Sequence, residues 1–224
     1  MVSVLRPGQP HINIPGIGVT TSRRAVASGA AAWYLTGGIP LANCKAAYAP
    51  KGATSAEAAK INLPTPGTND ATGGVNPTWD AATGWTGDGT MYLLAGTLTA
   101  SSAGMSLVFR YSNWVANGDY RCGSGGLYIA PLWFSATDNM HYAGSLVSYS
   151  AGTAAGVVAI AGQKAYFNGT LKGSFSGSVI NTPFGILARG DGSTRCRGSI
   201  SHYAIYDIDI SANIAVLSAA MAAL

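Results

Sequence analysis

Carboxylates are the first side chains to weigh, because paired acids carry out glycoside hydrolysis. The chain has one glutamate, Glu57, and eight aspartates, whereas a retaining glycosidase needs two carboxyl groups about 5 Å apart. The sequence also lacks a Gly-x-Ser-x-Gly elbow, a His-Glu-x-x-His motif and a phosphate-binding loop. His11, His141 and His202 are remote in sequence and leave a dispersed Ser-His-Asp triad open, although no residue points to one. We predict that the protein is not an enzyme.

Few residues in the sequence have the spacing of metal ligands. Asp207 and Asp209 are close in sequence and could chelate calcium, which takes several oxygen ligands, but such a pair more often caps a helix or stays solvated. The three cysteines, Cys44, Cys122 and Cys196, form no Cys-x-x-Cys or Cys/His zinc spacing. They are predicted to be small buried or half-buried thiols, of which at most one pair could form a disulfide. We predict no metal and no cofactor, and leave calcium near the aspartate pair open.

Aromatic side chains in the middle of the chain could bind carbohydrate without a metal. Residues 113–120 read as a loop, where an exposed tryptophan suggests a ligand contact. The alternatives are that Trp114 and Trp133 are buried between two sheets, or that the aromatic residues form a protein interface. The candidate carbohydrate-binding residues are Trp114, Asp119, Tyr120 and Trp133, and the candidate ligand is a host-surface glycan.

The net charge of +4 is unevenly distributed. Residues 1–56 carry five basic and no acidic side chains, and the rest carries eight basic and nine acidic ones. Prolines and glycines predict an extended arm over 1–32, which docks on an acidic surface or is a disordered tail. The basic residues form no run interleaved with aromatics, so nucleic acid is not a predicted partner. The candidate docking residues are Arg6, His11, Arg23 and Arg24.

Composition and hydropathy bear on where the protein works. Charged residues make up 10% of the chain, which is a weak solubility design for a free monomer and favours a protein packed in an assembly. An ordinary soluble β domain is the alternative. The apolar segment 25–35 is too short to cross a bilayer, and the start of the chain shows no signal peptide. We predict synthesis and assembly in a cytoplasm, with no membrane partner.

Short strands and tight turns must position these residues. The segment 105–113 alternates as a half-buried strand, with Met105, Leu107, Phe109 and Tyr111 on one face. Further strands are predicted over 46–48, 78–79, 91–99, 127–135, 141–150, 157–161, 184–188 and 199–206, with residues 136–139 as a connection and Trp85 anchoring a long loop.

Turn and cap residues mark the remaining elements. Asn168-Gly169 suits a type I′ turn in a hairpin over 165–175, because both positions need positive φ. Ser55 is predicted to cap a short helical turn. A closing helix is predicted from Ser211, its N-cap, to Leu224, with an apolar side that covers a sheet edge.

The order of elements in the last 60 residues is the most informative pattern. The hairpin AYFNGTLKG at 165–173 is followed by GILARG at 185–190, GSISHYAIY at 198–206 and the closing helix. This order, with the segment 46–93 upstream, resembles the concanavalin A-like (laminin-G-like) jelly-roll domain of bacteriophage structural proteins. The resemblance implies an all-β, two-sheet antiparallel β-sandwich over 33–224, an extended arm over 1–32 and a short C-terminal helix.

The resemblance also sets the expected function. The Glu-x-Asp-x-x-Glu run of the family's glucanases and the carboxylate cluster of its lectins have no counterpart in the sequence. We predict a non-enzymatic virion structural protein, a capsid decoration or tail-associated protein that docks on other virion proteins and presents a binding face outward. By analogy with viral members of the family it forms a homo-oligomer, with a trimer as the guess. The alternative is a free-standing carbohydrate-binding lectin.

Overall fold

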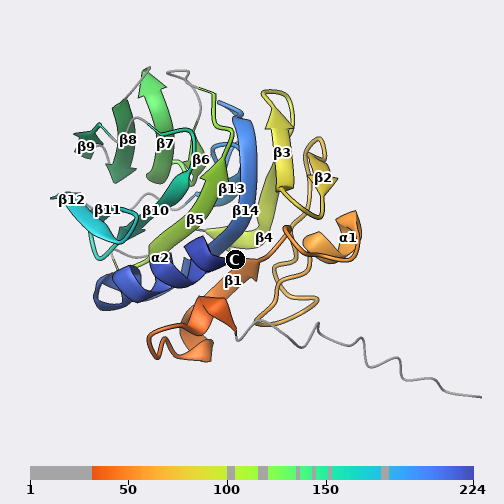
Figure 1. Cartoon of the computed structure of the whole chain (residues 1–224), viewed down its shortest axis with the longest axis horizontal. Coiled ribbons are helices and arrows are strands. Elements are labelled where there is room, and N and C mark those ends of the chain that lie inside the picture. The colour runs from red at the N-terminus through yellow and green to blue at the C-terminus, as the bar shows by residue number, and fades with distance from the viewer. Residues whose placement is uncertain are drawn as a thin grey trace, which may run out of the picture. The chain divides into compact units, whose positions relative to one another are not determined.

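The computed structural model describes residues 32–99, 104–115, 121–134, 137–142, 145–150, 153–177 and 182–224, except the side chains at 132–134, 137 and 138. The predicted docking residues of the arm, together with Asp119 and Tyr120, lie outside the described residues. The described chain folds into two antiparallel sheets, which confirms the predicted β-sandwich (Figure 1).

The larger sheet, sheet A, has the strand order β12-β11-β10-β5-β14-β3-β2 among the described residues, and β1 also pairs with β14. Its central strand β14 pairs with β5 along one edge, and with β3 and then β1 along the other. The strands of sheet A are β1 (Cys44–Tyr48), β2 (Thr78–Asp80), β3 (Gly84–Asp88), β5 (Ser106–Ser112), β10 (Gly156–Ala161), β11 (Lys164–Phe167), β12 (Thr170–Ser174) and β14 (Arg197–Tyr206).

The smaller sheet, sheet B, has the order β4-β13-β6-β7-β8-β9 in the described part of the chain. The predicted strand 141–150 is two strands, and the predicted connection 136–139 is wrong, because residues 137–139 pair with β7 and β9. The strands of sheet B are β4 (Leu93–Thr99), β6 (Cys122–Gly123), β7 (Leu127–Phe134), β8 (Thr137–Tyr142), β9 (Ser145–Tyr149) and β13 (Pro183–Ile186).

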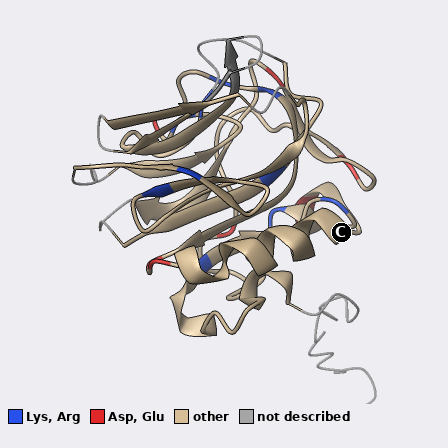
Figure 2. Ribbon diagram, turned by 60° about the vertical axis from the view of Figure 1, so that its left-hand side comes forward, with Lys and Arg blue, Asp and Glu red and all other residues tan. Residues whose placement is uncertain are grey.

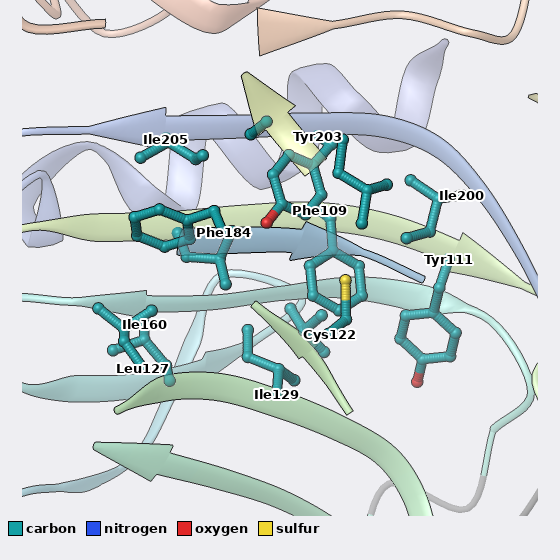
Figure 3. Close-up of a cluster of buried hydrophobic side chains, with 14 of the residues drawn as sticks. Phe109, Tyr111, Cys122, Leu127, Ile129, Ile160, Phe184, Ile200, Tyr203 and Ile205 are labelled. Carbon is teal, nitrogen blue, oxygen red and sulfur yellow. The ribbon is translucent and has the colours of Figure 1, made fainter. Parts of the chain in front are cut away.

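The main core lies between the two sheets (Figure 3). The alternation predicted for β5 is confirmed, since Leu107, Phe109 and Tyr111 are buried in this core. The ring of Phe109 stacks on that of Tyr203 from the neighbouring strand β14, with centroids 5.9 Å apart and planes at 15°. Trp85 also belongs to this core, but it lies in strand β3 rather than in a loop.

The other face of sheet A is covered as well. Helix α2 (Ile214–Ala223) buries Ile214, Leu217 and Met221 in a second apolar cluster with β5, β10, β14 and the short 3₁₀ helix η1 (Trp33–Leu35). The prediction that this helix covers a sheet edge is therefore wrong, because the outward side chains of the central strands are themselves apolar. Burying them against a helix removes them from water.

Two cations hold the C-terminal end of α2 on the sheet. The guanidinium Nη1 of Arg110, on β5, donates to the main-chain oxygen of Met221 at 2.8 Å. The Nζ of Lys51 donates to the main-chain oxygen of Leu224 at 2.6 Å. Positive charge is favourable there, because the last carbonyl groups of a helix lack partners within the helix and carry the negative end of its dipole.

The turns follow the predicted chemistry with one exception. Asn168 and Gly169 have φ values of 48° and 79°, as the type I′ turn between β11 and β12 requires. Ser55 caps α1 (Ala56–Ala59) by accepting from the amide of Ala58 at 3.0 Å. Ser211 is not the cap of the closing helix. It opens the 3₁₀ helix η3 (Ser211–Asn213), and its amide donates to Asp209 at 2.7 Å. A further 3₁₀ helix, η2, spans Leu41–Asn43.

Candidate ligand-binding face

The face of sheet B that points away from sheet A carries a cluster of polar and aromatic side chains. On β7, Leu127 and Ile129 point into the core, so Tyr128 between them points outward. On β8, Met140 is likewise a core residue, and His141 faces outward beside it. Tyr128 and His141 are direct cross-strand partners in the register of the two strands, which brings their rings together.

The two rings form a close stack that an arginine completes. The centroids of Tyr128 and His141 lie 4.4 Å apart with the planes at 19°. The guanidinium carbon of Arg121 lies 5.0 Å from the centroid of the Tyr128 ring, within the range of a cation–π interaction. Tyr128 is 8% exposed, whereas Arg121 and His141 are only half-buried. Arg121 and His141 are therefore the more exposed members of the stack, although the Nε of Arg121 and the Nε2 of His141 are themselves buried.

The electrostatics of the stack keep the imidazole neutral. Burial, together with the positive charge of Arg121, lowers the pKa of His141 to about 4. Burial raises the pKa of Tyr128, against the charges of Arg121 and Arg189, which lower it. At neutral pH the stack consists of a neutral imidazole, a neutral phenol and a charged guanidinium.

The loop between β13 and β14 fixes the main chain of Arg121. The Arg121 amide donates to the carbonyl of Thr194 at 3.2 Å, and the buried thiol of Cys196 donates to the carbonyl of Arg121 at 3.1 Å. The same loop holds Arg189, whose Nη2 lies 3.2 Å from the Oδ2 of Asp191. Main-chain bonds thus set the position from which the Arg121 side chain reaches Tyr128.

The row of polar side chains continues along β8 with Asn139, which is buried at 6% exposure. Asn139 lies two residues before His141, on the same side of the strand, and its Oδ1 accepts from the hydroxyl of Ser148 on β9 at 2.6 Å. Leu146, the β9 partner of His141, is 50% exposed. We call the set Arg121, Tyr128, Asn139, His141 and Arg189 the binding face.

The aromatic residues singled out from the sequence lie elsewhere. Trp114 is 3% exposed and packs in the main core, stacked on Phe109 at 6.2 Å and edge-on to Tyr111 at 5.6 Å. Trp114 is therefore buried between the sheets, which was the alternative prediction. Its proposed role as an exposed carbohydrate-binding residue is wrong. Trp133 lies in β7, but the structure does not describe its side chain.

Sequence reasoning missed Arg121, Tyr128, Asn139 and Arg189. The signal was present in the alternation of Leu127, Tyr128 and Ile129, which marks Tyr128 as the outward residue of a strand. The partnership with His141 depends on the register of β7 against β8, and sequence alone does not fix that register.

The two aspartates considered for calcium are engaged in the fold. Asp207 accepts from the Nζ of Lys45 at 2.7 Å and from the side-chain Nδ2 of Asn43 at 2.9 Å. Asp209 accepts from the main-chain amide of Ser211 and so caps the turn there. Among the described residues, no group of three or more His, Cys, Asp or Glu side chains is placed to hold a metal ion. Charged side chains are sparse over the described part of the ribbon (Figure 2).

The three cysteines are buried, as predicted, and none of them forms the single disulfide that the sequence left open. Burial raises the pKa of Cys44 and Cys122 to about 12 and that of Cys196 well above its ordinary value. Thiols in this state are poor nucleophiles, because the thiolate is the reactive form. No helix in the described part of the chain has the length and apolar character needed to span a membrane.

Comparison with known proteins supports the fold. No protein-family model and no curated protein matches the sequence. Among solved structures, Trypanosoma rangeli sialidase matches with a TM-score of 0.51 and 13% identity, over 80% of this chain and 33% of that one.

Two further solved structures match with lower scores. Domain 4 of AbnA, an extracellular arabinanase from Geobacillus stearothermophilus solved with arabinotriose, matches with a TM-score of 0.46 and 14% identity, over 79% of this chain and 98% of that one. The receptor binding domain of botulinum neurotoxin type G matches with a TM-score of 0.46 and 12% identity, over 77% of this chain and 50% of that one. At these identities the likeness to solved structures concerns the β-sandwich fold alone.

Proposed function

We propose that this protein is a non-enzymatic binding module that recognises carbohydrate through the binding face of sheet B. The observation that carries the proposal is the stack of Tyr128 and His141, flanked by the guanidinium of Arg121. Such a set suits a sugar, whose hydroxyl groups both donate and accept hydrogen bonds. A neutral imidazole has one donor and one acceptor, and a guanidinium has five donors in a fixed plane.

The chemistry of the face favours binding over turnover. General acid catalysis of glycoside cleavage needs a carboxyl group beside a second carboxylate. Asp191, the described carboxylate tied to this face, is paired with Arg189. Glu57, on α1, is paired with Lys60 at 3.1 Å. A ligand held by Arg121 and His141 would therefore be retained rather than cleaved.

A glycan microarray tests the carbohydrate part of the proposal. We expect the purified full-length chain to bind a restricted set of glycans, and both His141→Ala and Arg121→Ala to weaken that binding. Lys60→Ala is the matched control, because it removes one surface charge from α1 and leaves the binding face intact. Equal binding by all four proteins, each with native far-UV circular dichroism, would move the ligand site away from sheet B.

We further propose that the module is a virion component, either a capsid decoration or a tail-associated protein of a phage, assembled in the host cytoplasm as a homo-oligomer. Two sequence features support this: the resemblance to phage jelly-roll domains and the 10% content of charged residues. The basic residues among 1–32 would dock on other virion proteins. The measurement is the copy number of the chain in purified particles, by quantitative mass spectrometry. Hundreds of copies indicate decoration, a handful indicates a tail position, and none contradicts the virion role.

A further inference from the structure

A groove lies between helix α2 and the start of strand β10, on the face of sheet A that α2 covers (Figure 1). Its volume is about 340 Å³, which is at the lower end of the range for small-molecule sites. The binding face belongs to sheet B, so this groove is a separate place on the molecule.

Small side chains keep the groove open. Its wall on α2 consists of residues that recur every three or four positions and so share one side of the helix: Ala215, Ser218, Ala219 and Ala222. The turn between β11 and β12 comes close to this wall, since a Cβ at Gly169 would lie 3.0 Å from the Cα of Ala215. A larger side chain on this side of α2 would therefore take up the space of the groove.

Two polar side chains of the groove have hydrogen-bond donors left over. The Nη1 of Arg110 donates to the main-chain oxygen of Met221 at 2.8 Å, and no acceptor among the described residues is bonded to its Nε or Nη2. The Oδ1 of Asn168 accepts from the amide of Val157 at 2.8 Å, which leaves the two N–H groups of its Nδ2. No carboxylate is among the described residues that line the groove. A ligand there would have to supply the acceptors.

Ser218 adds an unpaired hydroxyl to the wall of the groove. The residue is 4% exposed, and its Oγ is buried without a hydrogen-bond partner among the described residues. An unpaired buried hydroxyl is unfavourable and uncommon in native structures. Because Ser218 lines the groove, rotation about its Cα–Cβ bond would turn the hydroxyl toward an acceptor bound there.

The charges next to Arg110 leave its guanidinium available. Lys51 donates to the main-chain oxygen of Leu224 at 2.6 Å, so the two cations together offset the negative end of the α2 dipole. His202 is the β14 partner of Arg110. Burial, with the positive charges of Arg110 and Lys51, lowers the pKa of His202 to about 4, so its imidazole is neutral at pH 7. Arg110 is thus the charged group of the groove lining.

We propose that this groove binds a small carboxylic acid with an apolar body. The Nε and Nη2 of Arg110 lie on one edge of the guanidinium, and such an edge forms two parallel hydrogen bonds to a carboxylate. Asn168 and Ser218 supply further donors, and the alanines of α2 contact the apolar body. The proposal does not rest on the proposed function, because the groove and the binding face are on different sheets.

Titration of the isotope-labelled full-length chain, followed by two-dimensional amide NMR spectra, tests the proposal. The probes are hexanoate and benzoate, and their neutral counterparts are hexanamide and benzamide. We expect at least one acid to shift the amide signals of residues 215–222 and of Asn168. Its neutral counterpart should bind at least about tenfold more weakly, because the charge-assisted hydrogen bonds are lost.

Variants of α2 place the ligand in the groove. Ala219→Leu fills the groove from an exposed helix position and should weaken binding of the acid at least about tenfold, because the ligand would clash with the new side chain. Ala223→Leu is the matched control, since it makes the same change at an exposed position that does not line the groove. Ser218→Ala should weaken binding about two- to tenfold, as loss of one neutral hydrogen bond does.

A variant of the turn tests the donors. Asn168→Asp keeps the oxygen that accepts from the Val157 amide, but it replaces the Nδ2 donor by a negative charge. Binding of the acid should weaken at least about tenfold, because like charges in a shared site repel each other. Binding of the neutral amide should change much less.

Each contrary outcome overturns the proposal. Equal binding of acid and amide would show that no charge is recognised. Unchanged binding in Ala219→Leu, or an equal loss in Ala223→Leu, would place the effect outside the groove. No shift of these signals with any of the four probes in the millimolar range would leave the groove without this ligand. None of these results bears on the glycan array, so the two proposals can fail separately.

Discussion

Replacing Trp114 by alanine tests whether this residue serves the core or a ligand. Its indole is 3% exposed and contacts the rings of Phe109 and Tyr111. Truncating a buried tryptophan costs about 3–5 kcal/mol, and each aromatic pair contributes about 0.5–1.5 kcal/mol beyond its buried area. The indole N–H has no hydrogen-bond partner among the described residues. Removing this unpaired donor therefore regains about 1–3 kcal/mol of the lost stability. We expect a net loss of about 3 kcal/mol.

Urea unfolding followed by far-UV circular dichroism measures this loss. Trp114→Phe is the matched control, because it keeps an aromatic ring beside Phe109 and removes the unpaired N–H. We expect its free energy of unfolding to fall by no more than about 1 kcal/mol. A loss below about 1 kcal/mol in Trp114→Ala would show that the indole does not support the core. Native stability combined with lost glycan binding would restore its role in ligand recognition.

Three further predictions concern the scaffold. Gly84→Ala should lower the free energy of unfolding in urea by more than about 1 kcal/mol, because φ is 94° and a Cβ there would clash with the main-chain oxygen of Ile200. An unchanged unfolding midpoint would contradict this. Burial, with the charge of Arg110, lowers the pKa of His202 to about 4. Between pH 6.5 and 4 the unfolded chain binds a proton at residue 202 that the folded chain does not, so the part of the stability that is due to His202 should fall by about 3 kcal/mol. His202→Gln should lose this part of the slope, and identical pH profiles would refute it. Arg110→Met should lower the free energy of unfolding by about 1.5–3 kcal/mol and speed amide hydrogen exchange in α2, because the hydrogen bond from Arg110 to the Met221 oxygen is lost. Unchanged exchange would show that this contact does not hold the helix.

Local sequence patterns predicted the elements whose causes are local. The alternation in β5 placed Leu107, Phe109 and Tyr111 on the core face correctly, because a strand repeats every two residues whatever its neighbours are. The Asn168-Gly169 turn was equally predictable, since few residues accept positive φ at two successive positions. The cap at Ser55 needs only the amide three residues later.

The features that were missed depend on contacts between distant segments. The closing helix covers the face of sheet A because Val108 and Ala204 make that face apolar, and this is visible only when β5 and β14 are side by side. The stack of Tyr128 and His141 depends on a register that the expected connection at 136–139 excluded. Trp114 adjoins a segment that reads as a loop, yet Gly198 leaves room for its indole, since a Cβ there would lie 2.8 Å from the ring.

The pairing of β14 has a consequence for how the chain folds during synthesis. This strand bonds to β5, β3 and β1, so the first described strand finds its partner only when Tyr206 reaches Cys44 across most of the sequence. Sheet A therefore cannot form its centre until residues 197–206 have left the ribosome. Such long-range pairing slows folding and leaves unpaired strand edges open to other chains in the meantime. The nascent chain would thus gain most from a chaperone in the interval before residues 197–206 emerge.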